Sequence, residues 1–384
     1  MTGKEPLIFV LPSLSRGGAE RVAVTLMPEL MRAFDVTVVL LERRLGYDLP
    51  DKTALVALSE KLAGSAAHIL RIPYHLAALA RLIRKKRAAI VLSFMEQANI
   101  LNLIASFWTR HKTVIVEHTV PRRQFGPERG ILGRLIMEAA RLTYRKADHI
   151  ITVSEGIKQA LLADFKPAPD RVTVIPNPVD AKTILSLAEE EPPFPLPKNF
   201  LLHVGRLTIN QKGQDILLET FSLLRRRYGG LKLILVGDGP DRPVLEALVR
   251  KLGLREQVIL AGARSNVFAF MARARMLILC SRYEGGPMVI TEAMTCGCPV
   301  VATDCPTGPR ELLGASEFGI LVSERSPLAL AAAIGRLLDD EELHRHYREQ
   351  AIRRAREHDV ARIGPRYVSL IRKYGDTSLI SRLL

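Results

Sequence analysis

Two glutamates flank a glycine turn in the second half of the chain. The stretch YEGGPMVITE places Glu284 directly before Gly285-Gly286-Pro287 and sets Glu292 eight positions after Glu284. It follows the apolar run MLILCS, so the pattern predicts a strand, a turn and a helix over 288–296 that Gly297 ends. A helix N-terminus presents free N–H groups and the positive end of its dipole, and glycines let a ligand approach the backbone. The turn therefore predicts a phosphate site with a carboxylate on either side.

The two carboxylates suggest different partners. Glu292 lies five residues past Pro287, roughly 7.5 Å along the helix at 1.5 Å per residue. With a diphosphate at the helix mouth, Glu284 is placed to meet a sugar and Glu292 to accept two vicinal ribose hydroxyls. Glu292 has an equally good alternative as a structural ion pair with an arginine, because its helical neighbours are mostly apolar and a buried carboxylate needs a partner. Spacing alone leaves both interpretations open.

Two cations stand at a second strand-to-helix turn, HVGRLTINQKGQD. Arg206 follows a strand and Lys212 begins the next helix. Cations at a helix N-terminus oppose the dipole, so an anion between them would explain both. A guanidinium and an ammonium group together neutralise a diphosphate. The alternative is that both are solvated loop cations.

The first half offers a third turn and a histidine. In LPSLSRGGAERVAV, Gly17 and Gly18 are placed to present N–H groups to a phosphate, and Glu20 falls in the first helical turn, where dipole compensation explains it. His118 ends the strand pattern TVIVEH. A lone histidine is more often structural or merely exposed, but a position at a carboxyl strand end makes a functional role more plausible.

Other patterns are weaker. LVGDGPDRP carries Arg242 where a dinucleotide fingerprint needs its third glycine, which excludes a dehydrogenase interpretation. The four cysteines, including Cys296 and Cys298, lack the further ligands of a structural zinc site and are expected to be buried thiols. No Asp-x-Asp occurs, so we expect no metal site at the diphosphate.

Strands alternate with helices along both halves of the chain. Apolar runs predict strands at 6–11, 35–41, 88–94, 112–118, 149–154 and 171–176, and again at 200–205, 231–237, 257–262, 276–281, 298–303 and 318–322. This order predicts an α/β protein with two doubly wound domains facing across a cleft. The acidic, proline-rich stretch 189–199 separates them. We expect an N-terminal domain over 1–180, a linker over 181–199, and a second domain over 200–359.

Charge is unevenly distributed over the 384 residues. The formal net charge is +15, and residues 1–146 hold 23 Lys+Arg against 12 Asp+Glu. Such an excess attracts phosphates or anionic lipid. Nucleic acid is not favoured, because aromatics make up only 5% and no binding motif appears. No secretory signal or membrane-spanning run is seen, which favours a cytoplasmic location.

Together these stretches resemble glycosyltransferase family 4, which has the two-domain, Rossmann-like GT-B fold. The resemblance rests on GGAERV, VSEGIKQAL, VIPNPVD, HVGRLTINQKGQDILLETF, LVGDGP, YEGGPMVITEAMTCGCPVVATD and GPREL, which are spread over nearly the whole chain. Where many members carry an aromatic, this chain has Gly286, so its sugar specificity could differ. CPTGPREL is similar to members that act on cell-surface polysaccharide or lipid-linked oligosaccharide.

The resemblance implies a retaining, metal-independent sugar transfer from a nucleotide-diphospho-sugar. It implies that Arg206 and Lys212 hold the diphosphate, that Glu292 holds the ribose, and that Glu284 contacts the sugar with the backbone of Gly285 and Gly286. Gly17 and Gly18 would close on the diphosphate, and His118 would lie near the sugar and acceptor. The last helix, within 360–384, would pack back on the first domain.

The expected donor is a UDP-sugar bound as substrate, with no cofactor and no metal. The transferred group would be a hexosyl or N-acetylhexosaminyl unit, and the acceptor a polyprenyl-diphosphate-linked saccharide. The basic segments 80–87 and 129–146 favour peripheral contact with an anionic membrane, on the cytoplasmic face of the inner membrane. The alternatives are a nucleotide-sugar epimerase or phosphorylase, and a non-catalytic nucleotide-sugar-binding membrane scaffold on the same fold.

Overall fold

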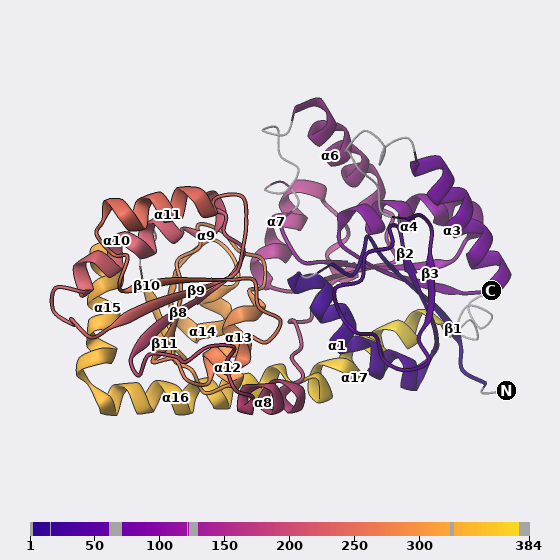
Figure 1. The fold of residues 1–384 in the computed structure, drawn as a ribbon. Helices are drawn as coiled ribbons and strands as arrows, with labels where there is room; N and C mark the ends of the chain where they lie inside the picture. Colours follow the sequence, from indigo (N-terminus) through magenta and orange to yellow (C-terminus); the bar gives the residue numbers. More distant parts are fainter. Residues whose placement is uncertain are drawn as a thin grey trace. The chain divides into compact units, whose positions relative to one another are not determined.

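The computed structural model describes residues 3–15, 17–60, 71–120, 122, 130–322 and 326–375. The chain divides into two compact units, each built around one parallel sheet (Figure 1). Unit 1 comprises Met1–Pro178 and Val360–Leu384, and unit 2 comprises Val179–Asp359. The predicted pair of parallel, Rossmann-like α/β domains is confirmed.

Unit 1 has a seven-stranded parallel sheet in the order β3-β2-β1-β4-β5-β6-β7. Its strands are β1 Pro6–Leu11, β2 Asp35–Leu40, β3 Ala54–Ala57, β4 Ile90–Phe94, β5 Lys112–Glu117, β6 His149–Thr152 and β7 Val172–Val174. The described helices are α1 Gly18–Ala33, α3 Ile72–Lys86, α4 Glu96–Thr109, α6 Gly130–Tyr144, α7 Glu155–Phe165 and α17 Val360–Gly375. Short β3 was not predicted, because its four residues are only partly buried at the sheet edge.

Unit 2 repeats the plan with six parallel strands in the order β10-β9-β8-β11-β12-β13. The strands are β8 Phe200–Val204, β9 Lys232–Val236, β10 Val258–Gly262, β11 Met276–Leu279, β12 Val300–Thr303 and β13 Ile320–Val322. Its helices are α8 Ala181–Glu189, α9 Ile209–Lys212, α10 Gln214–Leu224, α11 Arg242–Lys251, α12 Phe268–Met271, α13 Met288–Thr295, α14 Pro309–Leu313, α15 Pro327–Asp339 and α16 Glu341–Ala355. All six strands match predicted apolar runs.

Each sheet has one point where the strand order reverses. In unit 1 it lies between β1 and β4, and in unit 2 between β8 and β11. At such a point the two neighbouring strands send their helices to opposite faces, which opens a crevice at the carboxyl ends of the strands. The order of the strands therefore selects four turns as candidates for chemistry.

The stretch predicted as a linker is partly helical. Helix α8 occupies its first half and packs against α12 within unit 2. Asp180 caps the helix by accepting a hydrogen bond from the Thr183 N–H at 3.0 Å, and Ile184 and Ala188 are buried. Asn266 donates to the Leu187 carbonyl at 2.7 Å. The proline-rich remainder contains no helix or strand.

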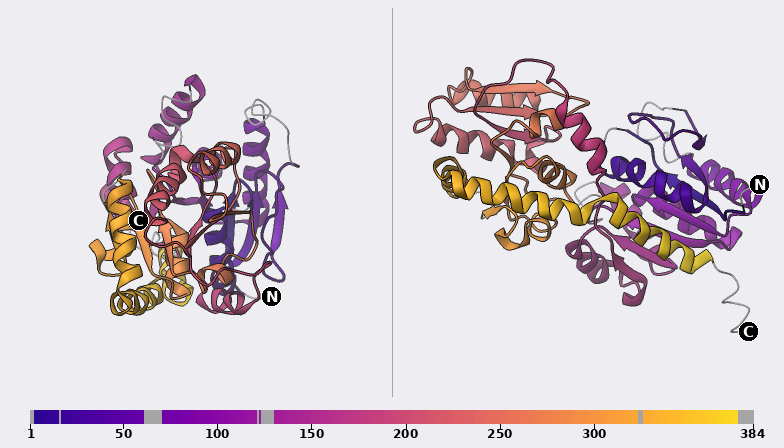
Figure 2. Two further views of the ribbon diagram at one scale, coloured as in Figure 1. Left: turned by 60° about the vertical axis from the view of Figure 1, so that its left-hand side comes forward. Right: turned by 90° about the horizontal axis from the view of Figure 1, so that it is seen from below.

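Helix α17 belongs to unit 1 although it follows unit 2 in the sequence. It lies alongside α1, and it also contacts β4 and β5 (Figure 2). Ile363, Tyr367 and Ile371 are its buried stripe. Tyr374 bonds to His149 at 2.9 Å, which ties the last turn to β6. None of the described helices combines the length and apolarity needed to cross a membrane.

Tyr367 provides a test of this packing. Its ring is fully buried, but its hydroxyl has no hydrogen-bond partner among the described residues. We expect Tyr367→Ala to lower stability by roughly 3–5 kcal/mol through the cavity it leaves. Tyr367→Phe should match or slightly exceed the wild type, because it removes a buried, unpaired polar group. Urea denaturation of the three proteins measures both effects. Equal losses in the two variants would contradict this account of the hydroxyl.

Candidate functional site

The switch point of unit 2 is lined by residues that the sequence singled out. Arg206 and Lys212 follow β8, and Glu284 follows β11, the strand beside it. The two turns are thus brought to the same edge of the sheet, although more than seventy positions separate them in the sequence. Arg206 is exposed, whereas Glu284 is buried.

An ion pair joins the two turns. The Lys212 Nζ lies 2.6 Å from the Glu284 Oε1, and the side chains are 16% and 7% exposed. Ser281 donates a second hydrogen bond to the same oxygen at 2.5 Å. Thr307 donates to the Glu284 backbone carbonyl. The carboxylate is therefore held by two neighbours and the backbone of Glu284 by a third, and Lys212 presents its charge at the edge of the sheet rather than in a solvated loop.

The pair depends on a close approach of two backbones. Gly213 sits between α9 and α10 with φ +65°, and a Cβ on it would stand 2.1 Å from the carbonyl oxygen of Cys280. The Cys280 thiol bonds to the Lys212 carbonyl at 3.1 Å. Only glycine supplies both the left-handed conformation and the space. A side chain here would separate Lys212 from the β11 turn.

Two further contacts hold these turns together. Arg282 makes a bidentate ion pair with Asp215, at 3.0 and 2.7 Å, and donates to the Ile209 carbonyl at 2.5 Å. The Arg206 loop is also paired with the turn after β9, where the Leu207 N–H donates to the Asp238 carbonyl at 3.0 Å. The turn of LVGDGP therefore borders the loop that carries Arg206.

A buried histidine supports the same loop from beneath. His203 donates from Nδ1 to the Ile278 carbonyl at 2.9 Å, and its Nε2 lies 3.3 Å from the Gln214 amide nitrogen. Gln214 in turn donates to the Arg206 carbonyl at 2.8 Å. Burial lowers the pKa of His203 to about 4, so the ring is neutral and accepts at Nε2. His203, Gln214 and Ser281 were not predicted; their roles depend on contacts across two strands.

Helix α13 begins where the sequence predicted it. Pro287 caps the helix, which runs to Thr295, and Gly297 follows its end with φ +66°. Gly285 is packed against Gly308, where a Cβ would meet the Gly285 carbonyl at 2.9 Å. Glu292 lies in the helix and is 4% exposed. Gly286 is more accessible than Gly285, so the turn keeps an open side.

In unit 1, Gly17 and Gly18 stand at the start of α1, after β1. Glu20 folds back over them, because a Cβ on Gly17 would meet its carboxylate oxygen at 2.3 Å. Tyr47 donates to the Gly17 carbonyl at 2.9 Å. Burial raises the pKa of Glu20, while its own backbone N–H acts in the opposite direction. The start of α1 therefore already holds a carboxyl group, at the position where dipole compensation would place one.

His118 follows β5 and is buried against Phe94, with ring centroids 4.8 Å apart. Burial lowers its pKa to about 3, and a hydrogen bond with Asn177 opposes that shift. The imidazole is therefore neutral at physiological pH. It can exchange hydrogen bonds with a bound group, but it is a weak proton acceptor there.

The residues on either side of His118 are tied to the first turn of α4. Asn99 donates to Glu117 at 2.7 Å, and Thr119 donates to Glu96 at 2.7 Å. Tyr144, the last residue of α6, also donates to Glu117. This polar network was not predicted, because its members come from separate helices and a strand.

Burial and the nearby Glu96 carboxylate raise the pKa of Glu117 well above its usual range. Directly before Glu96, Met95 has φ +68°, a conformation that costs a non-glycine residue energy and is common at functional turns. The carboxyl edge of β4 and β5 is therefore both strained and populated by acidic side chains.

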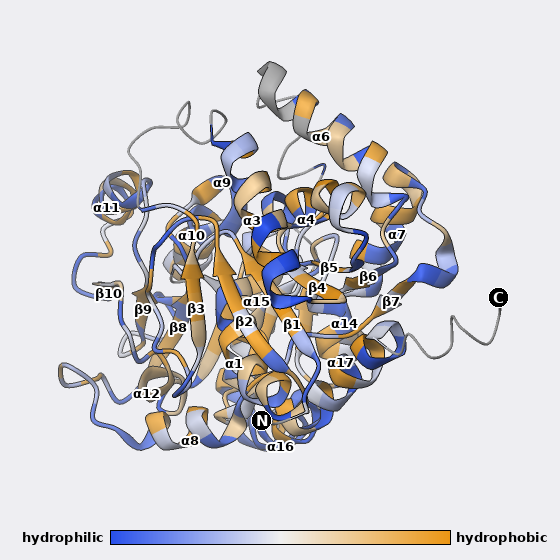
Figure 3. Ribbon diagram, turned by 90° about the vertical axis from the view of Figure 1, so that its right-hand side faces the viewer, coloured by the Kyte–Doolittle hydropathy of each residue, from blue (hydrophilic) through white to orange (hydrophobic). Residues whose placement is uncertain are grey.

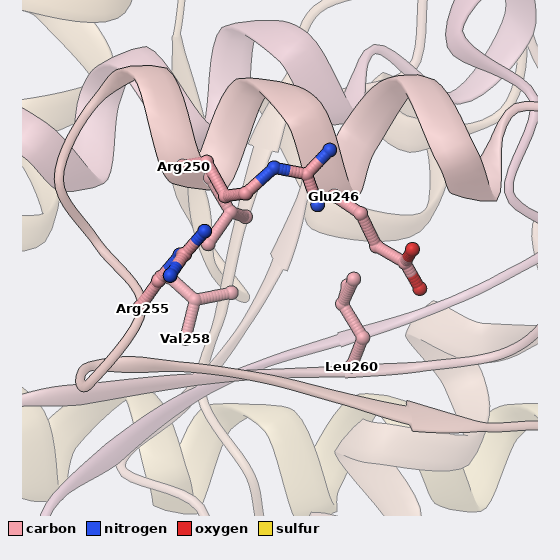
Figure 4. A pocket seen from close by; sticks show the side chains of 6 residues that line it. Glu246, Arg250, Arg255, Val258 and Leu260 are labelled. Carbon is pink, nitrogen blue, oxygen red and sulfur yellow. The ribbon is translucent and has the colours of Figure 1, made fainter.

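All four cysteines are free and buried, as predicted, and burial raises the pKa of Cys280 and Cys296 to about 12. Among the residues with described positions, no group of three His, Cys, Asp or Glu side chains is arranged to hold a metal ion. A shallow hollow between α11 and β10, lined by Glu246, Arg250 and Arg255, contains none of the predicted site residues (Figure 4).

Comparison with known proteins agrees with the geometry. The model of Glycosyltransferase Family 4 matches residues 16–183, and that of glycosyl transferases group 1 matches residues 187–354. A Campylobacter jejuni protein named N-acetylgalactosamine-N,N'-diacetylbacillosaminyl-diphospho-undecaprenol 4-alpha-N-acetylgalactosaminyltransferase is 30% identical over 360 residues, 93% of this chain and 96% of its own length. A second C. jejuni protein, an alpha-1,4-N-acetyl-D-galactosaminyltransferase acting on a PP-undecaprenol-linked saccharide, is 24% identical over 94% of this chain and 97% of its own.

Solved structures show the same fold. Sucrose-phosphate synthase from Thermosynechococcus elongatus has a TM-score of 0.81 at 19% identity, covering 96% of this chain and 99% of its own. HepE from Anabaena, solved with UDP, has a TM-score of 0.77 at 21% identity over 96% and 99%. Two Rossmann-like domains of this kind, each built on a parallel sheet, make up the GT-B fold. The chain belongs to glycosyltransferase family 4.

The raised pKa of Glu117 predicts how the stability of the protein changes with pH. The folded-state pKa of Glu117 is raised well above the usual 4.5 of a glutamate, so the stability it contributes is complete below that pH and is lost as pH rises through the folded pKa. Glutamine does not titrate. We therefore expect the melting temperature of Glu117→Gln to rise relative to that of the wild type as pH is raised from about 4.5 towards 9. The exposed Glu349→Gln controls for removal of a charge. If the difference in melting temperature between Glu117→Gln and the wild type stays constant over this pH range, a protonated Glu117 is contradicted.

Proposed function

We propose that this glycosyltransferase moves a hexosyl or N-acetylhexosaminyl unit from a UDP-sugar to a polyprenyl-diphosphate-linked saccharide, with retention of anomeric configuration. The observation that supports this most directly is the Lys212–Glu284 pair at the switch point of unit 2. It sets one cation and one carboxylate side by side at the mouth of α13, where a diphosphate and its sugar would meet.

The donor's diphosphate would be held by Arg206, Lys212 and the N–H groups at the start of α13. Arg206 is exposed and free to turn towards a ligand, while Lys212 is already placed by Glu284. These groups would stabilise the negative charge that develops on the leaving diphosphate, which is the electrostatic role expected to dominate. The proposed reaction is metal-independent, because these cations and the helix N-terminus supply the charge that a metal would otherwise bring.

The sugar would contact Glu284, together with the backbone of Gly285 and Gly286, and Glu292 would accept the ribose hydroxyls. A double displacement needs two carboxylates on opposite sides of the bond. Because Glu292 is assigned to the ribose, it is not left to serve as the second carboxylate of a double displacement. We propose instead that the acceptor's proton passes to the leaving phosphate. The low pKa of His118 supports this, since His118 would orient the acceptor by hydrogen bonds and not remove its proton.

UDP is favoured because HepE, which shares the fold, was solved with it. The acceptor class is favoured because the two C. jejuni relatives are named for undecaprenyl-linked substrates.

Gly17 and Gly18 would meet the diphosphate from unit 1, where Glu20 now occupies the start of α1. We propose that the protein works as a peripheral protein at the cytoplasmic face of the inner membrane, through its basic N-terminal unit.

A thermal-shift panel tests the donor. UDP at about 100 times its dissociation constant adds roughly 2.7 kcal/mol, or about 5–10 °C of melting temperature for a domain of this size. We expect UDP to give this shift and GDP, ADP and CMP to give much less. Glu292→Gln should weaken the UDP shift, whereas the exposed Glu219→Gln should leave it unchanged. A UDP shift equal in all three proteins would contradict the ribose role of Glu292.

A transfer assay tests the reaction itself. Purified protein, a panel of UDP-sugars and a water-soluble, short-chain prenyl-diphosphate saccharide should give a product longer by one sugar. NMR of the new anomeric proton should show the donor's configuration. Conversion of the UDP-sugar to an epimer without acceptor would identify an epimerase, and UDP binding without any turnover would identify a scaffold; either result overturns the proposal.

A further inference from the structure

Four exposed apolar side chains lie on two packed helices of unit 1. Phe107 and Trp108 stand near the end of α4 and are 54% and 58% exposed, while Leu135 and Leu142 on α6 are 63% and 71% exposed. Helices α4 and α6 pack against one another. We call these four residues the α4–α6 strip.

The strip extends along α6 towards the end of α4. Leu135 and Leu142 are seven positions apart, so they share one face of α6, about 10 Å apart along its axis. One turn after Leu142, the Lys146 ammonium lies 4.7 Å from the centre of the Phe107 ring. Figure 3 shows α6 standing out from unit 1 with hydrophobic and hydrophilic residues mixed along it.

Cations surround the strip. Arg141, Arg145 and Lys146 are exposed on and just after α6, and Arg110 is exposed beside Trp108. Arg84 reaches the Trp108 carbonyl at 3.1 Å. On the same face of α6, Glu138 is paired with Arg141 at 2.8 Å. Exposed aromatic and leucine side chains within a rim of long cationic ones match the chemistry of an anionic lipid surface, where rings sit at the headgroup level and cations meet phosphate.

We propose that the α4–α6 strip is the membrane-docking surface of this protein, with Phe107 and Trp108 entering the headgroup layer of an anionic bilayer. The inference rests on the proposed lipid-linked acceptor and names the surface that brings the enzyme to it. A second copy of the chain fits less well, since a two-fold interface here would bring the two cationic rims together.

The chain's single tryptophan makes the test direct. The full chain is mixed with vesicles of 30% phosphatidylglycerol in phosphatidylcholine, and Trp108 emission is recorded. We expect a blue shift, and quenching when the acyl chains carry bromine. Vesicles of phosphatidylcholine alone should give a much smaller change. Unchanged emission from protein that sediments with the vesicles would place the contact elsewhere and overturn the proposal, as would a failure to sediment.

Variants separate docking from catalysis. Phe107→Ser/Trp108→Ser should lower vesicle affinity roughly tenfold or more, because the buried apolar area is lost. Leu328→Ser, an equally exposed leucine on α15 of unit 2, should leave it unchanged. The double variant should keep its activity on a water-soluble, short-chain acceptor and lose most of it on a long-chain acceptor in vesicles. Equal activity on both acceptors would overturn the proposal.

The two proposals can fail independently. If the wild type transfers sugar to neither acceptor, the proposed function fails, while the Trp108 emission still decides whether the strip docks. If light scattering shows a dimer that Trp108→Ser dissociates, a second copy covers the strip and the membrane proposal is wrong.

Discussion

The ion pair between Lys212 and Glu284 is the interaction on which the turns at the switch point of unit 2 depend. Withdrawing two charges from water costs energy that their attraction only partly returns, so a buried pair is weak evidence for stability. Removing one partner leaves the other charged and unpaired, which is far more costly. What the pair secures is placement. It fixes a cation and a carboxylate at one spot before any ligand arrives, as a site that stabilises developing charge requires.

Several features of unit 2 serve that placement. Gly213 lets the α9–α10 corner touch the backbone of Cys280, and the Arg282–Asp215 pair closes the same joint from the other side. His203, kept neutral by burial, holds the loop of Arg206 through Gln214. The turn can therefore carry the exposed Arg206 while the histidine beneath it stays neutral. Loops of this kind, set on a firm parallel sheet, are where open α/β folds place their ligands.

Unit 1 presents a contrasting set of groups at its carboxyl edge. The pKa of Glu117 is raised and that of His118 is lowered, so burial favours the neutral form of both. Cationic side chains of unit 1 lie instead on exposed helices such as α6. Neutral hydrogen-bonding groups such as these two suit a saccharide acceptor, which is recognised by hydrogen bonds, and a cationic exterior suits an anionic membrane. The two units thus divide the proposed tasks of holding charge and receiving sugar.

The sequence predicted the parts of this picture that are local. Continuous apolar runs located all strands but β3, and glycine turns after strands located Gly17, Arg206 and Glu284. Periodicity could not reveal Ser281 or Gln214, because nothing local distinguishes their polar side chains from any others. Helix α8 was missed because the prolines after it dominate the composition of that stretch. Contacts between segments far apart in sequence become visible only when the sheet order is known.

The central claim is that Lys212, held by Glu284, binds the donor's diphosphate. Calorimetric titration of UDP and UMP into the wild type and into Lys212→Met/Glu284→Gln, which leaves no buried charge unpaired, tests it most directly. The account predicts that the wild type prefers UDP over UMP and that this preference falls roughly tenfold or more in the variant, since a charge-assisted contact contributes about 1.5–3 kcal/mol, while Arg206 and the N–H groups of α13 retain the rest. An unchanged preference would mean that the pair is structural and that the diphosphate is held elsewhere.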